Sequence, residues 1–124
     1  MLLNVLVVGI SGFLGSICRY LVYLWTASRG LNSLPVATLL INVSGCLLIG
    51  VVGVLVERAV PFHRHLFLAG SVGFLGAFTT FSAFGFETFN LIRDSQVGWA
   101  VANVLANVLL GLAAVWIGRT IVAA

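Results

Sequence analysis

Residues 73–87 read Gly-Phe-Leu-Gly-Ala-Phe-Thr-Thr-Phe-Ser-Ala-Phe-Gly-Phe-Glu, and this run makes a poor straight transmembrane helix. Thr79 and Thr80 are β-branched, and their hydroxyls compete for backbone carbonyls, so a helix is weakest there. Irregular backbone at membrane depth is tolerated only where protein or a water-filled cavity satisfies its polar groups, and broken helices often mark ion or substrate sites. Because phenylalanines also crowd this run, we expect a helix break here with a functional site around it.

The composition around this run excludes a soluble domain. Of 124 residues, 61% are hydrophobic and 7% are charged, which is far too little charge for a soluble surface. A transmembrane helix needs about 20 mostly apolar residues. The sequence therefore predicts an all-α integral membrane protein with one domain over residues 1–124. Its four expected transmembrane helices, the third of them broken, are 2–25, 35–56, 66–92 and 97–122.

The first apolar segment is not a signal peptide by its sequence. It lacks a basic leading region, and Arg19 stands where a small-residue cleavage site would be, so we expect a mature helix. Arg19 lies several residues inside this span, where an arginine is costly unless it is paired or reaches the interface. Two readings stay open: Arg19 is a structural charge that snorkels to the interface, or it concentrates anions in a vestibule.

The net charge of +3 comes from arginine alone, since the chain has no lysine. Four spans put both termini on one side of the membrane, and the arginines divide almost evenly between the two sides. Orientation follows the Lys/Arg bias between loops, so a bias near zero indicates insertion in both orientations. The charges are scattered rather than clustered, which argues against nucleic-acid binding.

Cysteine and histidine offer no metal centre. Cys18 and Cys46 lie in separate apolar spans, and no Cys/His spacing typical of a metal site occurs. His63 and His65 flank an arginine in a short expected loop, but two ligands do not make a tetrahedral zinc site. With no nucleophile–base pair either, the sequence predicts that the protein is not an enzyme.

Four glycines in the first and third spans predict close helix packing. Gly9, Gly12 and Gly15 recur every three residues in the first span, and Gly73 opens the run quoted above. Small residues at such spacing let a neighbouring helix approach closely. We therefore assign these four glycines to helix packing.

Polar side chains mark the inner faces of the second and fourth spans. Thr38 and Asn42 are at i, i+4, and Asn103, Asn107 and Gly111 are at i, i+4, i+8. Two readings of Asn42 stay open. It is interhelical glue, worth about 0.6 kcal/mol on average in membranes, or its amide N–H groups face an anion. We place Thr38, Asn42 and Asn107 on a candidate ion path.

The chemistry of these groups favours a small anion. They are neutral amide and hydroxyl donors, and phenylalanine rings are electropositive at their edges. Four short helices scarcely enclose a pore, so we expect a homo-oligomer. Carbonyls of an unwound segment can also hold Na⁺. Two helix breaks that meet at a symmetry axis would supply four such carbonyls to one ion.

Three motifs resemble the Fluc (CrcB) family of fluoride channels, and together they cover essentially the whole four-span chain. They are Gly12-Phe-Leu-Gly-Ser-Ile-Cys-Arg-Tyr, Pro35-Val-Ala-Thr-Leu-Leu-Ile-Asn-Val-Ser-Gly and the run at 73–87. The resemblance implies a passive fluoride-selective channel that exports cytoplasmic fluoride and relieves its toxicity. It also implies an antiparallel, dual-topology homodimer with two pores, in the plasma membrane of a prokaryote.

The resemblance also assigns residues. It implies a structural Na⁺ at the dimer interface, held by the main-chain carbonyls of Gly76 and Thr79. The residues that match the fluoride path are Asn42, Phe81, Ser82 and Phe84.

The sequence departs from the family pattern in three places. Gly76-Ala77 replaces the usual Gly-Gly, Ala83 replaces a threonine, and Gly111 stands where a serine is common. Two other classes remain as alternatives. A small dual-topology proton-coupled multidrug exporter would need a carboxylate deep in a span, and a structural membrane subunit would leave the phenylalanine-flanked break without a purpose.

Overall fold

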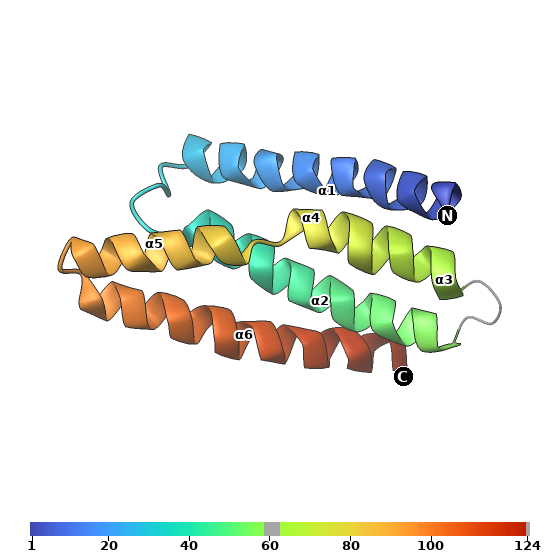
Figure 1. The fold of residues 1–124 in the computed structure, drawn as a ribbon. Helices are drawn as coiled ribbons and strands as arrows, with labels where there is room; N and C mark the ends of the chain where they lie inside the picture. Colours follow the sequence, from blue (N-terminus) through green and yellow to red (C-terminus); the bar gives the residue numbers. More distant parts are fainter. Residues whose placement is uncertain (59–62, 124) are drawn as a thin grey trace.

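The computed structural model describes residues 1–58 and 63–123, and they are almost entirely helical. It contains four helices long and apolar enough to cross a membrane, as predicted, so the all-α membrane class is confirmed. Helix α1 covers Leu2–Ser28, α2 covers Val36–Arg58 and α6 covers Val97–Ala123. The third span, Arg64–Arg93, consists of several pieces. The helices lie side by side, with both termini at the same end of the molecule (Figure 1).

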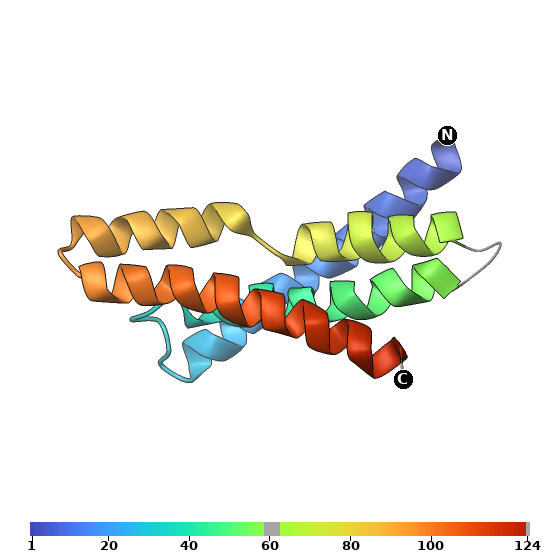
Figure 2. The ribbon, with the colours of Figure 1, turned by 90° about the horizontal axis from the view of Figure 1, so that it is seen from below.

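The third span changes its helical geometry along its length. Its pieces are α3 at His63–Leu66, the π-helix η1 at Phe67–Leu75, α4 at Gly76–Phe78 and α5 at Phe81–Arg93. Between α4 and α5 the backbone is extended, with φ −77° and ψ 160° at Thr79 and φ −150° and ψ 115° at Thr80. Figure 2 shows this link as a stretched strand-like connection between two helical rods.

The wide turns of η1 and the short α3 were not predicted. At the end of η1 the Gly76 N–H reaches the carbonyl of Ser71, five residues back, as in a π-helix. π-Helical turns are rare and occur often at functional sites. His65, expected in a loop, lies in α3 and is exposed. Residues 59–62 of that loop lie outside the described residues.

The first half of the third span packs on α1 through glycine. A Cβ built on Gly15 would overlap the backbone carbonyl of Phe74, and one on Gly73 would overlap the Ser11 hydroxyl. A Cβ on Gly12 would come within 3.5 Å of the Gly73 carbonyl oxygen. Gly9 has open space within 4 Å, so a single chain gives it no packing partner among the described residues. The two helices therefore touch backbone to backbone over about two turns.

The most extensive helix contact joins α2 and α6, which run in the same direction along their shared seam (Figure 1). The close approach is reciprocal, because Gly50 lies against the Val115 carbonyl and Gly118 against the Leu47 carbonyl. Small residues at both sites let the two backbones approach closely, as is common in membrane helix pairs.

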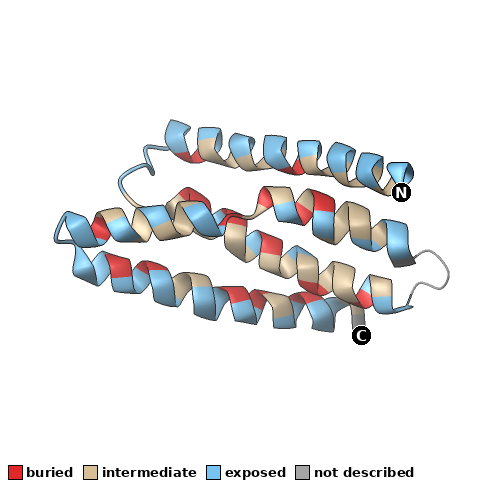
Figure 3. Cartoon of the chain, in the orientation of Figure 1, coloured by how far each residue is buried: buried red, intermediate tan, exposed pale blue. Residues whose placement is uncertain are grey.

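Few residues are buried, and most are exposed or partly exposed (Figure 3). Many of these exposed side chains are large and apolar, among them Phe13, Leu109, Leu112 and Trp116. Because water cannot cover such a surface favourably, the exposed faces suit lipid. Charged groups gather near the ends, where Arg119 pairs with Glu57 at 3.1 Å.

Candidate ion path

Asn42 and Thr80 form a two-point hydrogen-bonded contact at the extended link. The Thr80 N–H donates to Asn42 Oδ1 at 3.0 Å, and Asn42 Nδ2 donates to the Thr80 carbonyl oxygen at 3.2 Å. The second Asn42 N–H faces α6 and donates to Asn107 Oδ1 at 3.0 Å. One side chain on α2 therefore holds the backbone of the third span and a side chain of the fourth.

The link redirects two backbone donors that a continuous helix would use. In an α-helix the N–H of residue i+4 bonds the carbonyl of residue i, so the Gly76 carbonyl would receive the Thr80 N–H. That N–H goes to Asn42. The Thr79 carbonyl would receive the Ala83 N–H, which donates instead to Thr80 Oγ1 at 3.2 Å, the N-cap contact of α5. Carbonyls of this kind are suited to a cation of the size of Na⁺.

A chain of amides continues from Asn42 along α6. Asn107 Nδ2 donates to Asn103 Oδ1 at 3.0 Å, and Asn103 Nδ2 donates to Thr88 Oγ1 of α5 at 2.9 Å. Asn103 is 6% exposed, so its amide has left water and needs these partners. The three asparagines therefore form one continuous polar line inside the bundle, from the link to the middle of α5.

A second polar cluster lies near the start of α2. Thr38, which is fully buried, donates to Glu87 Oε1 at 2.7 Å, and its hydroxyl also lies 3.1 Å from Tyr23 Oη. The outer oxygens, Glu87 Oε2 and Asn90 Oδ1, are buried and have no hydrogen-bond partner among the described residues. A cavity of about 210 Å³ beside Glu87 and Asn90 opens towards the loop that carries Asn32 and Ser33.

Two aromatic rings stand directly after the link. Phe81 is 83% exposed, and its ring centroid lies 5.6 Å from that of Phe84, with the rings tilted by 48°. Ser82 is exposed, and its hydroxyl lies 3.2 Å from Thr80 Oγ1. The Phe81 ring is therefore left largely uncovered by the single chain, next to the polar backbone of the link.

A hollow with a volume of about 350 Å³ lies beside the link. It is lined by groups from α2 and from the third span, including Asn42, Gly76, Thr79, Thr80 and Phe81. Gly76 is exposed, so its backbone can be reached from outside the chain. Residues of the candidate Na⁺ site (Gly76 and Thr79) and of the candidate ion path (Asn42 and Phe81) therefore line one shared hollow.

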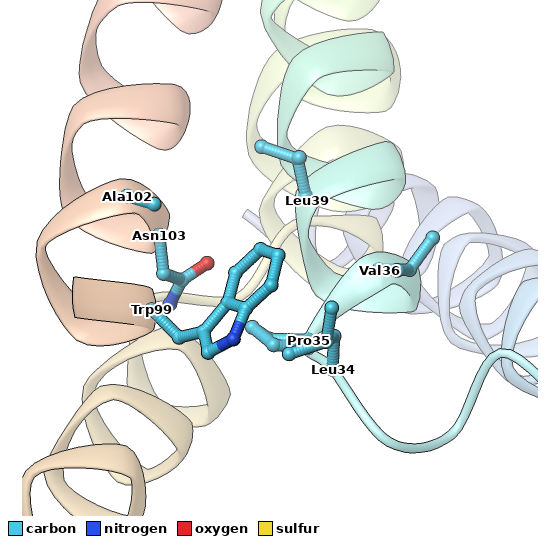
Figure 4. Close-up of a pocket in the computed structure, with 7 residues that line it drawn as sticks. All are labelled: Leu34, Pro35, Val36, Leu39, Trp99, Ala102 and Asn103. Carbon is cyan, nitrogen blue, oxygen red and sulfur yellow. The ribbon is translucent and has the colours of Figure 1, made fainter. Parts of the chain in front are cut away.

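A smaller apolar notch of about 140 Å³ lies between the first turns of α2 and α6. Trp99 covers it, and Pro35 and Leu39 form its wall, with Asn103 at the inner edge (Figure 4). The notch is almost wholly apolar, so it adds no donor to the line of amides.

The structure brings together most of the residues that the sequence marks. Asn42, Asn107, Phe81, Phe84 and Ser82 all gather within the line of amides and the link. Thr38 belongs to the separate Glu87 cluster, one turn of α2 away. Arg19, on α1, is half-buried and has no carboxylate partner among the described residues.

Five further residues in these networks were not assigned to the path from sequence. They are Tyr23, Thr80, Glu87, Thr88 and Asn103. The i, i+4 spacing of Asn103 and Asn107 carried a signal for Asn103, since both must face one neighbour. For Thr88 no such signal exists in a single sequence, because its partner is fifteen residues away on another helix.

The fold and these networks define a class: a small four-span membrane protein with a polar line through its bundle. A protein-family model described as CrcB-like protein, Camphor Resistance (CrcB), matches residues 6–119. The chain belongs to this CrcB-like family.

Named relatives cover nearly the full chain. The fluoride-specific ion channel FluC of Solibacter usitatus is 42% identical over 113 residues, 91% of this chain and 93% of that protein. FluC of Geobacter metallireducens is 38% identical over 94% of both chains. FluC 3 of Methanosarcina barkeri is 37% identical over 95% of this chain and 89% of that protein. These relatives are named as channels, not as enzymes.

Proposed function

We propose that this chain forms a passive fluoride-selective channel that lets cytoplasmic fluoride leave the cell. The observation that carries the proposal is the position of the exposed Phe81 ring beside the link, where the line of amides begins. Ring edges and N–H groups both attract an anion. The family and the names of the relatives agree with this chemistry.

The export follows from proton chemistry and needs no coupled energy source. Fluoride enters cells as neutral HF and is trapped as F⁻ at neutral pH, so an open path down its electrochemical gradient is sufficient. Selectivity comes from a narrow path in which donors replace the water around a small anion. Such replacement by a preorganised set of groups is the general basis of ion selectivity in channels.

The working unit in this proposal is an antiparallel homodimer whose subunits insert in opposite orientations. The near-equal division of arginines between the two sides supports dual insertion. The exposed Phe81 ring and the open hollow beside the link support a second chain, because each offers a surface that one copy leaves uncovered. The helix break of the third span then meets its copy at the symmetry axis.

A structural Na⁺ at that axis is part of the proposal. The carbonyls of Gly76 and Thr79 fit such an ion, because both have lost the ordinary helical donor and both residues line the hollow. Two carbonyls from each subunit give four oxygens, a ligand type that suits Na⁺. The ion supplies positive charge near the paths and joins the two breaks.

Glu87 gives a specific reason to keep a second candidate, a proton-coupled exporter. Its carboxylate bonds the fully buried Thr38 in the first turn of α2. An exporter of organic cations would depend on that carboxylate. Transport driven by a proton gradient and abolished by Glu87→Gln, with no fluoride flux, would favour the exporter.

The first test is anion efflux from liposomes that contain only this purified protein, with Na⁺ on both sides. The proposal predicts rapid fluoride loss while chloride is retained. Equal release of both anions would contradict selectivity. Absence of fluoride flux from a folded dimer would contradict the channel, and the departures at Ala83 and Gly111 would be examined first.

A further inference from the structure

We propose that Asn42 is a positioning residue for Na⁺: its carboxamide holds the link so that the Gly76 carbonyl is available to the ion. The inference rests on the proposed Na⁺ site and gives that site a support on α2. It concerns the side chain that the sequence left open between interhelical glue and an anion donor.

The hydrogen bonds of Asn42 show how its carboxamide is used in this structure. A primary amide has two N–H donors and one carbonyl oxygen. Both donors of Asn42 are engaged, one with the Thr80 carbonyl at 3.2 Å and one with Asn107 Oδ1 at 3.0 Å. Its oxygen accepts the Thr80 N–H at 3.0 Å. In this structure all three polar groups of the Asn42 carboxamide therefore bond other parts of the protein, and two of the three bonds go to Thr80.

The same contacts fix the backbone conformation at the link. Asn42 bonds both backbone polar groups of Thr80, and its oxygen takes the Thr80 N–H, which the extended backbone would otherwise leave without a partner. In lipid such groups must be bonded within the protein. Without Asn42 the Thr80 N–H would regain its partner by turning back to the Gly76 carbonyl, which is the ordinary helical bond. That bond would occupy the oxygen that Na⁺ needs.

Asn107 provides the matched comparison. It bonds the same carboxamide from the α6 side, and its other hydrogen bonds among the described residues go to Asn103 and not to the Thr80 backbone. Removing the Asn107 side chain takes away one acceptor and leaves the Asn42–Thr80 pair intact. Hydrogen bonding between α2 and α6 is therefore weakened when either Asn42 or Asn107 is changed. The link, however, loses its hydrogen-bonded support only when Asn42 is changed.

The experiment measures how Na⁺ stabilises the purified dimer, without any flux assay. Thermal unfolding is recorded over a series of Na⁺ concentrations, with K⁺ making up constant ionic strength, for wild type, Asn42→Ala, Asn42→Ser and Asn107→Ala. We expect both Asn42 variants to raise the Na⁺ concentration for half-maximal stabilisation about tenfold or more, since two hydrogen bonds to the link are lost. Asn107→Ala should stay within about twofold of wild type, because the link is untouched.

Each outcome decides between the two proposals. If Asn42→Ala has the same half-maximal Na⁺ concentration as wild type, the positioning role is overturned while the Na⁺ site stands. An equal rise in Asn107→Ala overturns it too, since general loosening of the bundle would then explain both. If Na⁺ does not stabilise the wild-type dimer at all, the Na⁺ part of the proposed function fails, and this inference falls with it. Fluoride efflux measured separately tells whether the channel itself survives.

A second measurement needs no substitution, in case the Asn42 variants do not fold. Linkage is reciprocal, so an ion that favours the extended link must also favour the Thr80–Asn42 bond. Amide hydrogen exchange of Thr80 in the wild-type protein should therefore become at least several-fold faster when K⁺ replaces Na⁺. An exchange rate at Thr80 that is the same in both salts contradicts the proposal.

Discussion

The two halves of the third span are attached to the molecule by different means. The first half, η1 with α4, lies on α1 with glycine backbones in direct contact, at Gly15 and at Gly73. The second half, α5, is joined to its neighbours by side-chain hydrogen bonds, from Thr38 to Glu87 and from Asn103 to Thr88. Thr80, at the junction, uses both its backbone groups on Asn42.

The difference shows how one span can serve two purposes. Backbone packing depends on shape alone and tolerates almost no added volume, so the first half is a fixed platform. Each hydrogen bond between membrane helices contributes little stability. The polar groups that form these bonds, however, line the bundle, and an ion can take the place of a hydrogen-bond partner. The second half is therefore attached through polar contacts and not through close backbone packing, and the link separates the two halves.

The largest expected effect comes from adding one carbon to the platform. Gly15→Ala places a Cβ against the Phe74 backbone, which cannot yield as a side chain could, so we expect a loss of about 1–3 kcal/mol of stability. Thermal unfolding of the purified protein in detergent measures it. Gly9→Ala is the control, since Gly9 has open space around it and should change little. Equal stability of the two variants would show that the platform is not tightly packed.

An intermediate effect is expected from the aromatic pair at the start of the second half. Phe81→Ile keeps an apolar side chain but removes the electropositive ring edge, so fluoride flux should fall about tenfold, the factor given by about 1.4 kcal/mol. Liposome efflux measures the flux, and size exclusion confirms that the dimer persists. Phe86→Ile, at another exposed ring of α5, is the matched control. Unchanged flux in Phe81→Ile would remove the ring from the path.

The smallest effect should follow the loss of one hydrogen bond in the second half. Thr88→Val removes the hydroxyl that accepts from Asn103 and keeps the shape of the side chain. We expect about 0.6 kcal/mol of lost stability, the average for such bonds between membrane helices. Thr88→Ser restores the hydroxyl and should recover it in the same unfolding assay. A loss as large as that of Gly15→Ala would erase the distinction between the two halves.

The sequence was sufficient for the gross fold because hydropathy is a property of each segment alone. Four apolar runs of membrane length predict four spanning helices, and the structure contains them. The π-turns of η1 were missed, since nothing in the sequence of residues 67–75 distinguishes π-helical turns from α-helical ones. Its wide turns depend on how that run meets α1, which no single segment reveals.

The candidate site could be predicted only in part, for a similar reason. Residue type and spacing indicate that Asn42, Asn107 and Phe81 have special surroundings, but not which groups they contact. The partner of Asn42 turns out to be a peptide group, and a backbone contact leaves no mark in the sequence. Counting residues places Glu87 near an end of its span, but it does not reveal that the Glu87 carboxylate accepts a hydrogen bond from the buried Thr38.

The two chain ends lie at the same end of the bundle, and this has a consequence for gene fusion (Figure 1). A short linker from the last residue of one copy to the first of a second starts and finishes on one side of the membrane. Such a tandem protein is forced into a single orientation for both copies. An added membrane-crossing helix in the linker reverses the second copy. Comparing the two tandem genes for fluoride resistance in cells would therefore read out subunit orientation directly, without purification of the protein.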